Sequence, residues 1–238
     1  MKIPVLDHGY VRLVDHMGSD LTVVNAARAS FAKQSQWVRN QPGNLSKKDQ
    51  RLITYLTQHG HLSPFRHVTI QLEVKAPLMV ARQWWKYVVG GDHTMDGWNE
   101  TSRRYVAAEP EFYIPAQWRR ASEDKKQGSG APIDGPVSEA LTNQLRSFQQ
   151  DAAKLYDHTL ALGVVAEQAR LFLPMYGLYT SWFWTTSLQG AAHFLRQRLD
   201  DEAQVEIQVY AKAVHDLLST GLPELQHSLA ALIDLSPG

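Results

Sequence analysis

Apolar and polar positions along the chain follow two periods, which predict a mixture of strands and helices. Residues 68–75 alternate between apolar and polar side chains, which is typical of a strand with one buried face. Residues 1–20 alternate more weakly and predict a strand followed by a turn, and residues 111–114 predict a short strand. The aromatic run LYTSWFWTT at 178–186 predicts a strand that belongs to the core.

A period of about 3.6 residues predicts helices between these strands. The predicted helices are 21–31, 46–59, a segment opened by Pro77 and broken at Gly90, 137–162, 164–173 and 188–199, with further helical sequence over 201–235. Ser46 and Ser187 stand where N-caps are expected, and Ser46 with Asp49 resembles a capping box. No internal repeat and no linker divides the sequence. We therefore expect a single α/β (α+β) domain over residues 1–238, with a mixed sheet and long helices.

Residues 117–136 are rich in glycine, serine, lysine and aspartate, and we expect them to form the most mobile loop of the chain. The segment includes Gly128-Ser129-Gly130, but neither a third glycine nor a strand-turn-helix context follows. The dinucleotide-binding fingerprint is therefore absent, and so is the Walker lysine motif.

Charge and hydropathy restrict the class of protein. Lysine plus arginine number 24 and aspartate plus glutamate number 24, so no overall field attracts the chain to nucleic acid or to an anionic membrane. No apolar run reaches membrane-spanning length, and the first residues do not form a signal-peptide pattern. We expect a cytoplasmic protein. A nucleic-acid-binding protein remains an alternative, but the chain has no basic stripe to favour it.

The chain contains no cysteine, which excludes disulfides, thiolate metal sites and thiol nucleophiles. His59, His61 and His67 lie close together in the sequence. Their spacing fits no standard zinc signature, and no carboxylate completes it, so we predict no metal site.

The densest group of hydrogen-bonding side chains lies between Arg82 and Tyr105. Residues 99–105 (NETSRRY) combine a carboxylate, a serine and two arginines. Two arginines beside a serine can bind a phosphate bidentately, and a nearby glutamate can bind a sugar hydroxyl. A solvated charged turn is the alternative interpretation, but the tryptophans Trp84, Trp85 and Trp98 argue against it.

Gln83 and the run 99–105 resemble the nucleotide-binding segment of the flavin-dependent thymidylate synthases. Where that family has Arg-His-Arg, this chain has Lys86-Tyr87-Val88. Thirteen residues, instead of the family's seven, separate Val88 from the following serine, Ser102, which indicates a loop insertion at about 90–98. The resemblance extends from Leu13 to about Leu218.

The resemblance implies a set of site residues. For the nucleotide it implies Gln83, Lys86, Glu100, Thr101, Ser102, Arg103, Arg104, Arg170 and Arg198. For FAD it implies His61, Ser63, Lys86, Tyr87, Val88, Asn99, Glu100, Ser187, Gln189 and His193. Arg198 corresponds to the family's catalytic arginine. Judged from the residues alone, Arg170 could be a snorkelling surface arginine, and Gln189 with His193 could form a solvated helix stripe.

The resemblance also implies an activity, which is flavin-dependent reductive methylation of C5 of a uridine monophosphate. It implies FAD, with methylenetetrahydrofolate and NADPH as co-substrates, and a homotetramer with shared active sites. The changed Arg-His-Arg segment favours a specialised branch, similar to the UMP C5-methylases of polyoxin-type nucleoside antibiotic pathways, with UMP as the main substrate and dUMP also accepted. The alternatives are a housekeeping thymidylate synthase, which converts dUMP to dTMP, and a catalytically inactive homologue that binds nucleotide or flavin.

Overall fold

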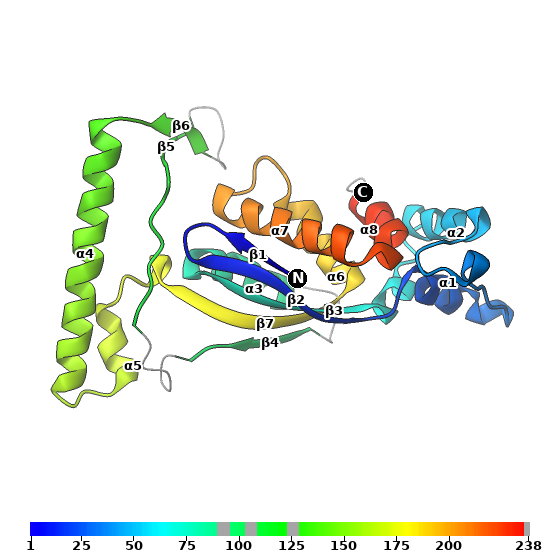
Figure 1. Ribbon diagram of the computed structural model, residues 1–238, viewed down its shortest axis with the longest axis horizontal. Coiled ribbons are helices and arrows are strands. Elements are labelled where there is room, and N and C mark those ends of the chain that lie inside the picture. The colour runs from blue at the N-terminus through cyan, green and yellow to red at the C-terminus, as the bar shows by residue number, and fades with distance from the viewer. Residues whose placement is uncertain (90–95, 103–108, 123–128, 236–238) are drawn as a thin grey trace.

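A five-stranded sheet with the order β1-β2-β3-β7-β4 forms the centre of the fold in this computed structural model (Figure 1). The structure describes residues 1–89, 96–102, 109–122 and 129–235. The strands of the sheet are β1 (Lys2–Val5), β2 (Gly9–Met17), β3 (Thr69–Pro77), β7 (Tyr179–Ser187) and β4 (Gly97–Glu100). The predicted strands at the N-terminus, at 68–75 and at 178–186 are confirmed.

The prediction of a mixed sheet is wrong, because all four strand pairs of this sheet are antiparallel. The alternation of apolar residues reports which face of a strand is buried and says nothing about the direction of its neighbour. A short turn joins β1 to β2, which permits only an antiparallel pair. In the pair formed by β3 and β7, Pro77 at the end of β3 lies opposite Tyr179 at the start of β7, so these two strands also run in opposite directions.

Eight α-helices accompany the sheet in the part of the chain that the structure describes. They are α1 (Asp20–Arg28), α2 (Lys47–Gln58), α3 (Leu78–Val89), α4 (Pro136–Ala161), α5 (Ala166–Ala169), α6 (Leu188–Arg198), α7 (Val205–Gly221) and α8 (Gln226–Ile233). The short 3₁₀ helices are η1 (Ala29–Phe31), η2 (Val38–Asn40), η3 (Ser63–His67), η4 (Arg170–Phe172), η5 (Met175–Gly177) and η6 (Pro223–Leu225). The predicted caps are confirmed: Ser46 Oγ accepts from the Asp49 amide at 3.2 Å and Ser187 Oγ from the Gly190 amide at 3.1 Å.

Two further elements differ from the prediction. The expected helix at 164–173 is divided into α5 and η4, which end where Leu173 adopts an extended conformation before Pro174. The expected strand at 111–114 is reduced to an isolated bridge between Phe112 and Leu178.

One face of the sheet carries the core. Trp84 of α3 lies between Trp182 and Trp184 of β7, in edge contacts with ring centroids 5.5 Å apart in each case, and stacks on Phe194 of α6 at 4.3 Å. Tyr210 of α7 is fully buried in the same cluster. The aromatic strand is therefore core, as predicted. The contacts of its tryptophans hold α3, α6 and α7 on one side of the sheet. The opposite face carries the polar residues of β3.

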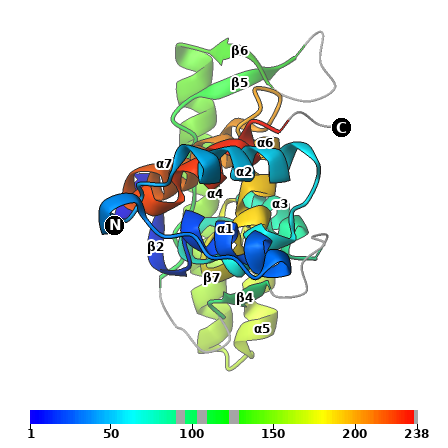
Figure 2. The same ribbon diagram turned by 90° about the vertical axis from the view of Figure 1, so that its right-hand side faces the viewer.

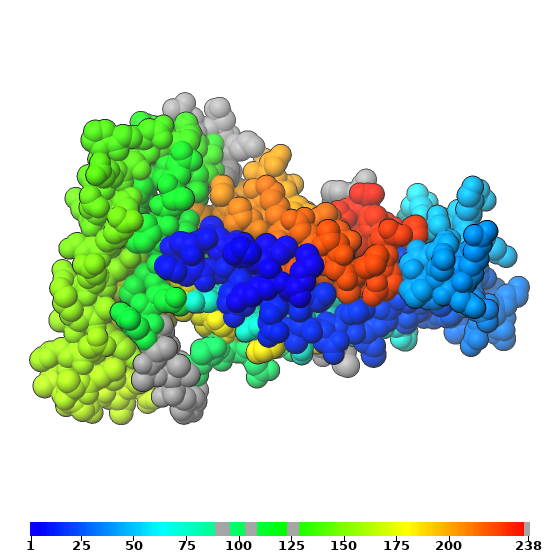
Figure 3. Space-filling model, viewed as in Figure 1, coloured from blue at the N-terminus to red at the C-terminus, as the bar shows by residue number. Residues whose placement is uncertain are grey.

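Helix α4 lies across one end of the sheet and extends beyond it (Figures 1 and 2). The space-filling view shows how far it stands from the body of the sheet (Figure 3). The antiparallel pair β5 (Trp118–Ala121) and β6 (Ser129–Ile133) packs near its N-terminal end. The segment expected to be a mobile loop, 117–136, thus contains two strands, while 123–128 lie outside the described residues. Across the described helices, none has the length and apolar character needed to span a membrane.

Arg28 and Asp49 form an ion pair that joins α1 to α2. Arg28 Nη2 lies 2.6 Å from Asp49 Oδ1, and the hydroxyls of Ser35 and Ser46 also donate to the carboxylate, at 2.8 and 2.7 Å. Burial by itself would raise the pKa of Asp49. The hydrogen bonds from Ser46, Arg28 and Ser35 outweigh it, and the pKa lies below its usual value.

We predict that Asp49→Asn lowers the free energy of unfolding by about 2 kcal/mol at pH 7, because it leaves Arg28 without its counter-charge. A carboxylate with a lowered folded-state pKa stabilises the fold above its unfolded pKa and loses that effect as the pH falls through the folded value. The difference should therefore shrink below about pH 4. Denaturant unfolding at pH 7 and below about pH 4 measures this difference in the free energy of unfolding. Asp151→Asn, which changes an exposed ion pair, is the control. A penalty that does not change with pH would contradict the assignment.

Candidate active site

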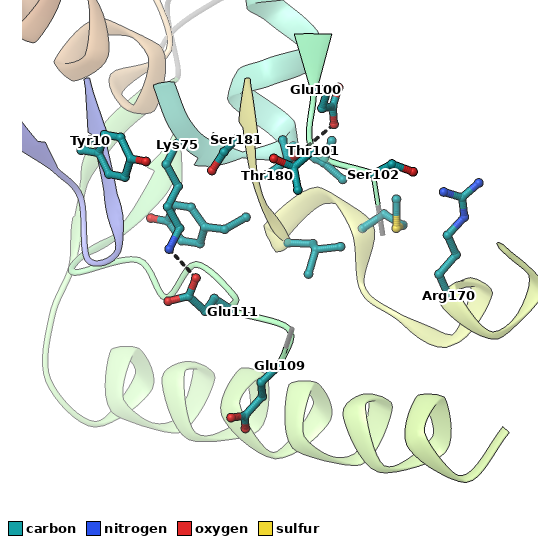
Figure 4. A pocket seen from close by; sticks show the side chains of 14 residues that line it. Tyr10, Lys75, Glu100, Thr101, Ser102, Glu109, Glu111, Arg170, Thr180 and Ser181 are labelled. Atoms are coloured by element: carbon teal, nitrogen blue, oxygen red, sulfur yellow. Dashed lines mark hydrogen bonds and ion pairs between the residues drawn. The ribbon is translucent and has the colours of Figure 1, made fainter. Parts of the chain in front are cut away.

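A cavity of about 560 Å³ opens where β4 and β7 meet the η4–η5 segment (Figure 4). Four of the residues predicted to contact the nucleotide line it, namely Glu100, Thr101, Ser102 and Arg170. Residues far apart in the sequence thus meet here, because β4 pairs with the edge of β7, and η4 and η5 precede that strand in the chain.

Strand pairing fixes the first of these residues. Glu100 lies opposite Trp182, and the Thr101 amide donates to the Ser181 carbonyl at 2.8 Å. Thr180 Oγ1 donates to Glu100 Oε1 at 2.8 Å. Trp98 stacks on Trp182 with centroids 4.6 Å apart, so the tryptophan noted in the sequence anchors β4 to the core.

Arg170 enters the cavity from the opposite wall. Its Nε donates to the carbonyl of Glu167 in α5 at 3.3 Å. Figure 4 shows Arg170 on the side of the cavity where Ser102 lies. A hydroxyl and a guanidinium that face one space form a suitable site for a phosphate. Arg103 and Arg104, also predicted for this group, lie outside the described residues.

The inner end of the cavity contains polar residues that the sequence did not single out. Lys75 forms an ion pair with Glu111, and Tyr10 donates its hydroxyl to Glu73 at 3.0 Å. Burial, together with the bond to Glu73, raises the pKa of Tyr10. The polar positions of the alternation at 68–75 were the available signal, since they place Lys75 on the open face of the sheet.

Arg198, the predicted catalytic residue, does not line the cavity that contains Ser102 and Arg170. It lies at the C-terminal end of α6. Its guanidinium carbon is 5.3 Å from the ring centroid of Tyr87. His193 contacts the same ring at 5.6 Å, and the Tyr87 hydroxyl donates to Gln197 at 2.8 Å. Burial raises the pKa of Tyr87, and the nearby Arg198 only partly offsets it. Tyr87 is therefore a neutral partner that does not compensate the arginine's charge.

Arg198 and His193 border a cavity of about 940 Å³, and among the described residues no hydrogen-bond partner reaches the buried Nε of Arg198. A neighbouring cavity of about 570 Å³ is lined by His61, Ser63 and Gln189. The two cavities share Gly60 and Leu62, so they adjoin. Four of the residues predicted for the flavin and the predicted catalytic arginine thus border one continuous region, the four being His61, Ser63, Gln189 and His193.

Arg66, which the sequence did not assign to this region, lies in it. Its Nε donates to Gln189 Oε1 at 3.0 Å, and this leaves the terminal nitrogens of the guanidinium for a ligand. Ser187 caps α6 next to Gln189. The guanidinium, the Gln189 amide and a histidine are donors of the kind that bind phosphates, so this region fits the pyrophosphate of a dinucleotide such as FAD.

The other predicted residues lie apart from these cavities. Lys86 is exposed on α3, Asn99 is exposed on β4, and Val88 packs against the core. Gln83 donates through Nε2 to Gln204 Oε1. Within the described parts of the chain, no cluster of histidine, aspartate and glutamate is arranged to hold a metal ion.

The sequence and the fold both match known proteins. A family model described as "Thymidylate synthase complementing protein" matches residues 12–224. A flavin-dependent thymidylate synthase of Thermus thermophilus is 42% identical over 224 residues, which are 94% of this chain and 76% of that protein. The enzyme of Thermotoga neapolitana is 39% identical over 223 residues, 94% of this chain and 91% of its own.

Among solved structures, the chain is similar to a UMP/dUMP methylase, PolB, from Streptomyces cacaoi. The form bound to 5-Br dUMP superposes with a TM-score of 0.74 at 26% identity over 96% of each chain. The form bound to 5-Br UMP gives a TM-score of 0.77 at 24% identity over 99% of each chain, which shows the shared fold. The predicted single-domain α/β fold is thereby confirmed.

Proposed function

Because this chain belongs to the flavin-dependent thymidylate synthase family, we propose that it methylates C5 of uridine 5′-monophosphate and also accepts dUMP. The predicted class of enzyme, a methyltransferase that uses FAD with methylenetetrahydrofolate and NADPH, follows from the family. The observation that carries the choice of UMP is the likeness, over 96% of both chains, to a UMP/dUMP methylase. The replacement of Arg-His-Arg by Lys86-Tyr87-Val88 supports the same choice.

Conversion of dUMP to dTMP is the second candidate. The 42% identity to the Thermus thermophilus thymidylate synthase favours it. The two candidates share every step except the recognition of the sugar. A site that accommodates the 2′-hydroxyl gains about 0.5–1.5 kcal/mol from one added hydrogen bond, which produces a preference of several-fold between the two nucleotides.

The nucleotide phosphate is bound by Ser102 and Arg170, with Arg103 and Arg104 assigned to it by resemblance alone. Glu100 is held by Thr180 at the mouth of the same cavity and accepts from a sugar hydroxyl. A carboxylate acceptor beside a cationic phosphate site fixes both ends of a ribose phosphate, which orients the pyrimidine.

Arg198 activates the pyrimidine. FAD, when bound, supplies the hydride that completes the methyl group. Without a cysteine, the chain cannot add a thiolate to the ring, so C5 must become nucleophilic by electrostatic means. Loss of the N3 proton to solvent leaves a uracil anion whose adjacent N3 and O2 can accept two parallel hydrogen bonds from the guanidinium, and these bonds stabilise the negative charge. Tyr87 is neutral and contacts Arg198, so it leaves the positive charge of the Arg198 guanidinium uncompensated.

The expected homotetramer with shared sites is part of this proposal. The cavity with Ser102 and Arg170 and the cavity with Arg198 have no lining residue in common. One nucleotide would therefore contact both groups only if two copies of the chain meet. Exposed apolar side chains on α4 and after it support such contacts, among them Phe148 (58% exposed), Leu171 (81%) and Tyr176 (74%).

Subunit mixing tests the shared site. We expect Arg170→Glu and Arg198→Ala each to be inactive alone at a low UMP concentration, and their mixture to regain activity after subunit exchange. An intact site would then form from the unaltered Arg198 of one copy and the unaltered Arg170 of another. A mixture that stays inactive although native mass spectrometry shows mixed oligomers would contradict the proposal.

FAD binding tests the flavin region. Arg66→Ala should weaken FAD binding by about tenfold or more, since a charged hydrogen bond to phosphate contributes about 1.5–3 kcal/mol. Titration with flavin absorbance and fluorescence measures this, with Arg51→Ala on the exposed side of α2 as the control. If the FAD affinity of Arg66→Ala is unchanged, this region does not bind the pyrophosphate.

The activity itself is tested by incubating the protein with UMP, FAD, NADPH and methylenetetrahydrofolate labelled with ¹³C in the transferred carbon. We expect a ¹³C methyl signal on C5 of the nucleotide by NMR. FAD and nucleotide binding without any methyl product, from UMP or dUMP, would instead identify the inactive binding homologue.

A further inference from the structure

A polar groove between α2 and α8 adjoins the cavity that the predicted catalytic arginine borders. The groove has a volume of about 810 Å³ and shares Thr57 and Leu235 with that cavity. At its other end, the side-chain amides of Gln50 and Gln226 donate to carbonyls of the segment 43–45, at 2.9 and 3.4 Å. The groove therefore runs along α2 from the catalytic region to the start of that helix.

Side-chain amides and hydroxyls of α2 line this groove, from Gln50 through Thr54 to Gln58. Gln50 uses one N–H of its amide for the bond to the segment 43–45 and keeps the second for a ligand. Gln58 is exposed, and its amide makes no hydrogen bond to a residue that the structure describes. One acid, Asp234, lines the groove at the end near the catalytic region. A ligand with amide groups fits these walls, and its carboxylates are favoured at the opposite end.

Exposed basic side chains gather at that opposite end. Lys47 and Lys48 form the first turn of α2, one turn before the first lining residue of the helix, and Arg39 stands on the loop that leads into it. None of the three is ion-paired with a residue that the structure describes. From residue 21 to residue 67 the sequence has one acid, Asp49, which is buried and already bound by a guanidinium. The N-terminus of α2 adds to the positive potential, so this end favours anions.

We propose that the groove between α2 and α8 binds the oligo-γ-glutamate tail of the folate co-substrate. The inference rests on the proposed function, in which the folate delivers its carbon to the pyrimidine beside Arg198, in the cavity that adjoins the groove. A folate ends in a glutamate, and further glutamates are joined to it through their γ-carboxyl groups. Each added unit thus brings one amide and one more carboxylate. The amides match the walls of the groove, and the carboxylates match its basic end.

The length of α2 sets the number of glutamates that the groove accommodates. Gln58 and Lys47 lie roughly 16 Å apart along the axis, since a helix rises about 1.5 Å per residue. An extended α-linked residue spans about 3.6 Å, and a γ-linked glutamate has two more carbons in its chain, which gives about 6 Å per unit. A tail of about three glutamates therefore reaches from the catalytic region to the lysines, and longer tails extend past them.

Binding of folates that do not react tests the groove without turnover. The probes are folic acid, which carries a single glutamate, and its triglutamate and pentaglutamate forms, titrated by calorimetry into the protein loaded with FAD and UMP. We expect the triglutamate to bind the wild type about tenfold more tightly than folic acid does, because each exposed ion pair contributes only a few-fold. The pentaglutamate should bind within about twofold of the triglutamate, since its last units lie beyond the lysines.

Two variants address the groove itself. Ala230→Trp places a large ring in the groove from an exposed position of α8, and Lys47→Glu reverses a charge at its basic end. Each should leave the Kd for folic acid unchanged and reduce the tenfold gain of the triglutamate to about threefold or less. Ala140→Trp on α4 and Lys212→Glu on α7, both at exposed positions, are the matched controls and should keep the full gain.

The inference is wrong if the wild type binds folic acid and the triglutamate equally well, or if the gain survives both variants. It is also wrong if the control variants lose the gain, or if Ala230→Trp and Lys47→Glu weaken folic acid as much as the triglutamate, because the effect is then not specific to the tail. When the wild type binds folic acid and methylates UMP, each of these results rejects the groove and leaves the proposed function standing. A wild type that binds no folate and forms no methylated product rejects both.

Discussion

Arg198→Lys should fold like the wild type and bind UMP, but should lose at least about 100-fold in kcat, the typical cost of removing one preorganised donor at a developing oxyanion. Lysine keeps the charge, but its ammonium is a point donor that cannot form two parallel bonds to N3 and O2. The arginine is also held against the Tyr87 ring at 5.3 Å, a planar contact that lysine would make less well.

Steady-state kinetics with UMP, together with the Kd from calorimetry, separate turnover from binding. Arg51→Lys, an exposed arginine of α2, is the matched control and should behave as the wild type. A kcat for Arg198→Lys within a few-fold of wild type would remove Arg198 from the catalytic role.

Arg170→Ala should raise the KM for UMP by about 10- to 100-fold and leave kcat nearly unchanged, because a guanidinium–phosphate bond contributes about 1.5–3 kcal/mol equally in the ground and transition states. The guanidinium faces the cavity that also contains Ser102. The nucleoside uridine, which lacks the phosphate, provides the discriminating comparison.

Uridine should bind the wild type and Arg170→Ala with equal, weak affinity, whereas UMP should distinguish them. Arg146→Ala on α4 controls for loss of a surface charge. If Arg170→Ala weakens the binding of uridine as much as the binding of UMP, Arg170 supports the cavity wall and does not bind the phosphate.

The fold could be predicted from the sequence wherever one local signal decided the structure. Alternation at 68–75 gave β3, the serines at 46 and 187 gave the starts of α2 and α6, and a long amphipathic period gave α4. The direction of neighbouring strands could not be predicted, because side-chain alternation is the same in parallel and antiparallel pairs on one buried face. The two strands β5 and β6 were hidden in a segment whose composition resembles that of a loop.

The candidate site shows a similar limit. The resemblance supplied Arg170 and Ser102, and the structure places them around one cavity. It could not show that Arg198 borders a different cavity, since that separation depends on the packing of α6 against α3. Arg66 was missed because its partner Gln189 is far away in the sequence and meets it only in the folded chain.

A competition assay shows whether UMP or dUMP is the preferred substrate. Equal concentrations of UMP and dUMP are incubated in one vessel with FAD, NADPH and methylenetetrahydrofolate, and the two methylated products are quantified by mass spectrometry, which gives the ratio of kcat/KM values. We predict that methylated UMP exceeds dTMP by several-fold, with both products formed. A ratio of tenfold or more in favour of dTMP would show that dUMP is the preferred substrate and identify the protein as a thymidylate synthase.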